Sequence, residues 1–156
     1  MTTLLLEHVS NKDYLNDCLG KLPGARRIEV DSVELRRHKV GRRSLFELQA
    51  RFIDDAGRQE PVRLFGKVRN KGVDEKTFVL NEFLYHNGFN EHSEDWISIP
   101  QPVALVPEVH MSLYRKAEGQ PVITKFKTDE WEFYARQIVR AAYKLNQSQC
   151  VLSKQH

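Results

Sequence analysis

The sequence predicts an α+β fold: a five-stranded antiparallel sheet with one helix packed on it, a short helix near the N-terminus and a helix near the C-terminus. Three neighbouring stretches alternate apolar and polar residues and are joined by short turns, as in an antiparallel meander. Stretches with helical spacing flank this meander, and two further strand-like runs follow it. The 156 residues suffice for one domain, or for one domain with an appendage.

The meander is predicted over residues 28–69. A first strand runs from Ile28 to about Lys39, and a change in its apolar phase near Asp31 indicates a β-bulge. The second strand, Ser44 to Ile53, alternates most clearly, with Phe46, Leu48, Ala50 and Phe52 on one face. In the third, Val62 to Arg69, three apolar residues share one face, and Arg63, Phe65, Lys67 and Arg69 share the other.

The remaining elements follow from caps, breakers and helical spacing. Ser10 is expected to cap a leading helix that ends at Gly20, and Asp74 a helix that ends near Asn87. The second of these helices should bury Val79, Leu80, Phe83 and Leu84. Two strands are expected at Ile99–Val106 and His110–Lys116, and a last helix from Asp129, paired with Glu132 as a cap, to Asn146.

These elements divide the chain into a leading helical segment (1–24), a central sheet domain (25–120) and a linker with the last helix (121–156). The net charge of +3 fits an anionic ligand but is too small to indicate nucleic acid. Cys18 and Cys150 lie far apart and are interpreted as reduced thiols of a cytoplasmic protein. The apolar run Leu4–Leu6 is too short for a signal peptide or a membrane span.

Lys67 is the principal candidate for a functional residue because it lies inside a strand and not at its end. In kinase-type folds a lysine on such a strand holds nucleotide phosphates. A second interpretation treats Lys67 as a solvated lysine beside Arg63 and Arg69 on an exposed sheet face. The strand pattern alone favours that second interpretation.

An ordered set of stretches resembles the N-terminal lobe of the aminoglycoside phosphotransferase and maltokinase-like branch of the protein-kinase-like family. The matching stretches are Arg37–Arg43, Phe65–Val68, Asn81–Phe89, Ile99–Pro102 and Leu113–Gly119. The end of the last helix, Tyr143–Ser148, looks like the first helix of the family's C-terminal lobe. The similarity covers about residues 28–148, and its weight rests on the order of the stretches.

The resemblance implies a lobe that binds ATP with Mg²⁺. Lys67 would then pair with the phosphates, and the turn containing Lys39, Gly41 and Arg42 would cover them. The strand end formed by Tyr114, Arg115 and Lys116 would offer backbone groups to adenine.

The sequence departs from the family pattern in two ways. The glutamate that usually pairs with the strand lysine would align near Thr77, and Glu82 and Glu75 are the nearest substitutes. The family's His-Gly-Asp catalytic segment and its metal-binding aspartate do not occur in these residues. The chain is therefore not expected to catalyse phosphoryl transfer alone.

Two other functions remain open at this stage. The chain could be a degenerate lobe that contacts a partner chain resembling the missing C-terminal lobe, or a second copy of itself through the last helix. It could also be a basic-patch binder of nucleic acid, which would require the arginines and lysines of residues 36–43 to converge with exposed aromatic side chains. The low net charge makes nucleic acid the weakest of these hypotheses.

Overall fold

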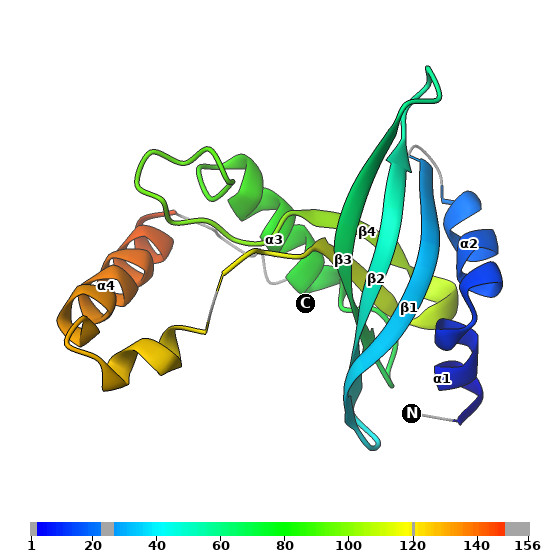
Figure 1. The fold of residues 1–156 in the computed structure, drawn as a ribbon, viewed down its shortest axis with the longest axis horizontal. Helices are drawn as coiled ribbons and strands as arrows, with labels where there is room; N and C mark the ends of the chain where they lie inside the picture. Colours follow the sequence, from blue (N-terminus) through cyan, green and yellow to red (C-terminus); the bar gives the residue numbers. More distant parts are fainter. Residues whose placement is uncertain (1–2, 23–26, 120, 149–156) are drawn as a thin grey trace, which may run out of the picture. The chain divides into compact units, whose positions relative to one another are not determined.

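The computed structural model describes residues 3–22, 27–119 and 121–148, and it confirms the α+β class with a five-stranded antiparallel sheet (Figure 1). The strands are β1 (Arg27–Lys39), β2 (Arg43–Ile53), β3 (Gln59–Arg69), β4 (Pro102–Val106) and β5 (Met111–Arg115). The helices are α1 (Thr3–Ser10), α2 (Lys12–Gly20), α3 (Glu75–His86) and α4 (Trp131–Gln147), with short 3₁₀ turns η1 (Pro107–Val109) and η2 (Val122–Lys127). No described helix is long and apolar enough to cross a membrane.

The chain divides into two compact units, and the division runs through α3. The first unit comprises residues 1–79 and 100–116, and the second comprises residues 80–99 and 117–156. The whole sheet therefore belongs to the first unit.

The sheet has the order β1-β2-β3-β5-β4, with every neighbouring pair antiparallel. The expected bulge in β1 is present between Val30 and Ser32, and a second irregularity lies between Leu35 and Arg37. The long β1, β2 and β3 are seen side by side in Figure 1.

One face of the sheet forms the hydrophobic core. Phe46, Leu48, Leu64 and Val68 are fully buried, as the alternation in β2 and β3 predicts. Gly66 belongs to this face, and a Cβ added to it would lie 2.6 Å from the sulfur of Met111. The absence of a side chain there lets β5 pack closely against β3.

The N-terminal helices cover this core rather than standing beside it. Val9, Leu15, Cys18 and Leu19 are buried in the same cluster as the strand residues, and α2 packs along β1 (Figure 1). Helix α1 was not predicted from the sequence. The cap at Ser10 was wrong because α1 ends there, and Asn11 caps α2 by accepting hydrogen bonds from the amides of Asp13 and Tyr14 at 3.0 and 3.1 Å.

Helix α3 begins as expected, because the Asp74 carboxylate accepts hydrogen bonds from the backbone and hydroxyl of Thr77. Its buried stripe was partly wrong. Val79 and Phe83 are exposed, whereas Phe78 and Tyr85 are buried together with the expected Leu84. The Phe78 ring lies 5.8 Å from that of Tyr114 on β5, so the start of α3 packs against the sheet.

The second unit contains the loop after α3, η2 and α4. Lys144 of α4 donates hydrogen bonds to the carbonyls of Gly88 and Ile97 and to the Asp95 carboxylate, which joins the helix to the loop. The expected Asp129–Glu132 cap was wrong: Glu130 occupies the N-cap position, and its side chain makes no capping hydrogen bond. Cys18 is a free, buried thiol, and Cys150 lies outside the described residues.

Candidate functional site

The sheet face opposite the core carries a concentration of basic side chains where β1, β2 and β3 run together. The register pairs Lys39 with Arg43 and Arg43 with Arg69. Two residues further along each strand, on the same face, Arg37 pairs with Leu45 and Leu45 pairs with Lys67. Because directly paired residues project from the same side of a sheet, these cations share one face.

These side chains line a hollow of about 230 Å³. The described residues that line it are Arg37, Lys39, Arg43, Ser44, Leu45, Lys67, Val68 and Arg69. Five of these eight are cationic and none is a carboxylate. A pocket with this lining favours an anion with several negative charges.

Lys67 lies on this face with its ammonium nitrogen 4.5 Å from the centre of the Tyr114 ring. The ammonium makes no ion pair or hydrogen bond with the described residues, so its three N–H donors are available to a ligand. Lys67 is exposed, as the second interpretation of the sequence expects, and its pKa is lowered first by partial loss of hydration on the sheet face and then by the positive charges of Arg69 and Arg43. A bound anion would offset that repulsion.

Most of the neighbouring cations are equally available. The side chains of Arg37, Lys39 and Arg43 make no hydrogen bond or ion pair with the described part of the chain. Arg69 is the exception, since its guanidinium lies 2.6 Å from the Asp74 carboxylate that caps α3. Arg69 is therefore held in place by the start of α3.

The pocket includes only some of the residues expected to bind a nucleotide. Lys67 and Lys39 line it, whereas Gly41 and Arg42 lie in the turn beyond its lining. Gly41 has a φ of 70°, so the turn requires a left-handed residue there. The Arg42 side chain is exposed.

The strand end expected to bind adenine already uses two of its backbone donors. The Arg115 amide donates to the carbonyl of Gln101, and the Lys116 amide to that of Arg63, both at 2.8 Å. The side chains are paired as well: Arg115 contacts Glu60 at 2.5 Å. Recognition of a base by these two N–H groups would require those bonds to break.

Glu82, one of the two nearest substitutes for the family's glutamate, has an exposed side chain on α3, and this side chain makes no ion pair or hydrogen bond with the described residues. Lys67 likewise has no carboxylate partner among them. The two residues belong to different units of the chain.

One of the ion-paired carboxylates on this sheet face is Glu47 of β2, which sequence analysis did not identify. It is buried, and it accepts hydrogen bonds from Lys116 at 2.6 Å and Arg36 at 2.8 Å. These bonds lower the pKa of Glu47, with Lys116 as the largest cause. Lys116 is therefore held by Glu47 and lies 5.4 Å from the Phe65 ring.

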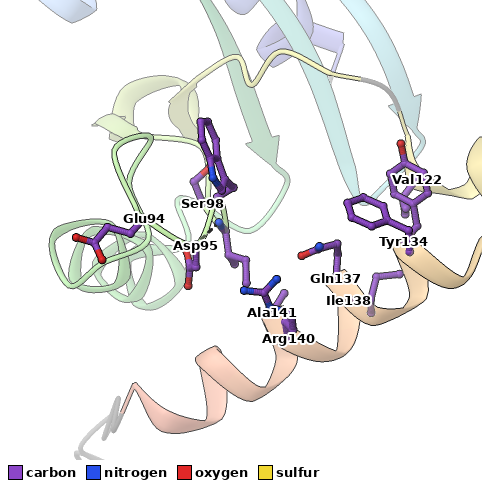
Figure 2. Close-up of a pocket in the computed structure, with 12 residues that line it drawn as sticks. Glu94, Asp95, Ser98, Val122, Tyr134, Gln137, Ile138, Arg140 and Ala141 are labelled. Carbon is purple, nitrogen blue, oxygen red and sulfur yellow. Dashed lines mark hydrogen bonds between the residues drawn. The ribbon is translucent and has the colours of Figure 1, made fainter. Parts of the chain in front are cut away.

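A second hollow of about 530 Å³ lies within the second unit, between the loop after α3 and helix α4 (Figure 2). Figure 2 shows Glu94, Asp95 and Ser98 on the loop side, and Tyr134, Gln137 and Arg140 on the helix side. Trp96 also lines it, with a φ of 61° and a side chain that is 92% exposed. Its charges are mixed, with Arg140 opposite two acidic residues, so it lacks the positive character of the sheet pocket.

Mg²⁺, which the family resemblance implies, does not fit the sheet pocket. The ion prefers carboxylate oxygens and water, whereas the charged lining residues are all cations. Among the described residues no group of three or more His, Cys, Asp or Glu side chains is placed to hold a metal ion.

Comparison with family models, with curated proteins and with solved structures found no match.

Proposed function

We propose that this chain binds a nucleotide such as ATP through its phosphates, as the nucleotide-binding lobe of a phosphotransferase-like protein. The observation that carries the proposal is the convergence of Arg37, Lys39, Arg43, Lys67 and Arg69 on one pocket. Lys67, which the resemblance relates to a phosphate-binding lysine, lies among them with its hydrogen-bond donors unused by described residues.

The proposal concerns binding and not transfer. Phosphoryl transfer requires a placed nucleophile and a base in addition to charge on the phosphates. The pocket supplies positive charge alone, and residues 1–156 contain no His-Gly-Asp segment.

Nucleic acid is a weaker ligand for the same surface. Stacking of bases needs exposed aromatic side chains next to the cations. The nearest aromatics on this sheet face are Tyr114, which is buried, and Phe65, which is half-buried beneath Lys116. The exposed tryptophans, Trp96 and Trp131, belong to the second unit.

An interaction module is the second candidate, and α4 is the observation that favours it. Trp131, Ile138 and Leu145 are 50, 45 and 51% exposed, and no side chain of α4 is buried. A partner chain or a second copy would cover these residues, and sedimentation over a range of concentrations would detect self-association.

The test of nucleotide binding is isothermal titration calorimetry with ATP, with and without Mg²⁺, on the wild type and on Lys67→Met. Methionine keeps much of the side-chain length and removes the charge. We expect saturable binding to the wild type and about a tenfold loss of affinity in the variant.

Lys12→Met is the matched control, because Lys12 is an exposed lysine on α2, which packs over the core face of the sheet. The control should bind as the wild type does. An absence of heat with every form of the protein, or equal affinities for wild type and Lys67→Met, would rule out the proposed site.

A further inference from the structure

The lining of the sheet pocket has a consequence for the form of the ligand. In kinase-type sites, metal ions bridge the phosphates and neutralise their charge, and protein carboxylates hold those metals. Here the protein itself supplies five cationic side chains around about 230 Å³. The neutralising charge is therefore already part of the protein.

We propose that the pocket takes the polyphosphate group in its metal-free form, directly on Arg37, Lys39, Arg43 and Lys67, and that Mg²⁺ opposes this binding. The inference rests on the proposed function, because it concerns the same pocket.

The charge of the ligand favours the metal-free form. Mg²⁺ coordinated to a triphosphate cancels part of its negative charge and occupies oxygens that the side chains would otherwise contact. Among the described ion pairs, the carboxylate that contacts a lining cation is Asp74. It already pairs with Arg69 and accepts hydrogen bonds from Thr77 at the start of α3. A metal complex would therefore lose attraction to the pocket without gaining a protein ligand from its lining.

The cations also come from several elements. Arg37, Lys39 and Arg43 come from β1 and β2, and Lys67 and Arg69 from β3, so the charges line the hollow from three adjacent strands. Each guanidinium group can donate two parallel hydrogen bonds to a phosphate, and an ammonium adds a compact further contact. The number of phosphates should therefore set the affinity, with triphosphate above diphosphate and diphosphate above monophosphate.

The test is calorimetry on the full chain with tripolyphosphate, ATP, ADP and AMP, each with EDTA and then with excess Mg²⁺ at constant ionic strength. We expect tripolyphosphate and ATP to bind in EDTA, and Mg²⁺ to weaken both by about fivefold or more. Arg43→Gln should weaken both in EDTA by about tenfold, whereas Lys12→Gln should not. Circular dichroism would confirm that each variant is folded.

The outcomes separate the two proposals. ATP binding that requires Mg²⁺ or does not respond to it would overturn the metal-free inference and leave nucleotide binding intact. Binding of tripolyphosphate without ATP would support the metal-free anion site and overturn the nucleotide. Failure of both ligands, with and without Mg²⁺, would overturn both proposals.

Discussion

At the residue scale, Glu47 is the charge whose removal should matter most for stability. Its side chain is 10% exposed and bonds Lys116 and Arg36, so Glu47→Gln leaves two cations facing a neutral amide. We expect the free energy of unfolding to fall by about 1–3 kcal/mol at pH 7, measured by urea denaturation. Glu34→Gln is the control, since Glu34 also contacts Arg36 but is 62% exposed, and its loss should cost less than about 1 kcal/mol.

The difference in stability between wild type and Glu47→Gln should decrease as the pH is lowered. The folded-state pKa of Glu47 is below its usual value of 4.5, so the stabilisation is present above pH 4.5 and is lost as the pH falls through the lowered folded value. The gap between wild type and Glu47→Gln should therefore shrink on acidification. A gap that is constant from pH 7 to pH 3 would contradict an ionic role for Glu47.

The sequence predicts which face of its own strand a residue occupies, but it does not predict which residues of other strands lie beside it. The two-residue period places Lys67 on the polar face of β3 and Phe46 on the apolar face of β2, as observed. Arg69 lies on the same strand as Lys67, whereas the grouping of Arg37 and Arg43 with Lys67 depends on the register between strands, which bulges in β1 shift. Sequence period alone does not fix that register.

At the element scale, α2 is predicted to be as necessary to the sheet as the strands themselves. Leu15 is fully buried in the core cluster, so Leu15→Ala should lower the free energy of unfolding by about 2–4 kcal/mol, measured by chemical denaturation. Leu145→Ala is the matched control on α4, where the leucine is 51% exposed and truncation should cost less than about 1 kcal/mol. Equal costs for the two variants would show that α2 is not part of the core.

The existence of most elements was predictable, and their ends and helical phases were not. The strong alternation in β2 and the proline, glycine and aspartate breakers located the strands and α3. Helix α1 was missed because its apolar run is short and its burial depends on contacts with other elements, including β1 and the distant η1. The buried stripe of α3 was misassigned because both Phe78 and Val79 are apolar, and tertiary packing selects between them.

At the scale of the whole molecule, the two units imply that α4 can loosen without disturbing the sheet. Within the second unit, Lys144 joins α4 to the loop after α3, since its ammonium contacts the Asp95 carboxylate at 2.8 Å and the Ile97 carbonyl at 3.1 Å. We expect Lys144→Met to speed amide hydrogen exchange in α4 and the 88–98 loop by about fivefold or more, with β2 and β3 unchanged. Lys127→Met, at an exposed lysine of η2, is the control.

The ion pair between Lys144 and Asp95 should weaken at low pH. Hydrogen bonds from Lys144 and from the Ile97 amide lower the pKa of Asp95 from 3.8 to about 2, so the contribution of this pair is complete above pH 3.8 and is lost as the pH falls through about 2. In wild type the protection of α4 should begin to decline below about pH 3.8 and be lost near pH 2, and in Asp95→Asn that decline should be absent. Protection of α4 that is unchanged in Lys144→Met, or lost only when β2 and β3 also exchange, would show that the second unit does not open separately.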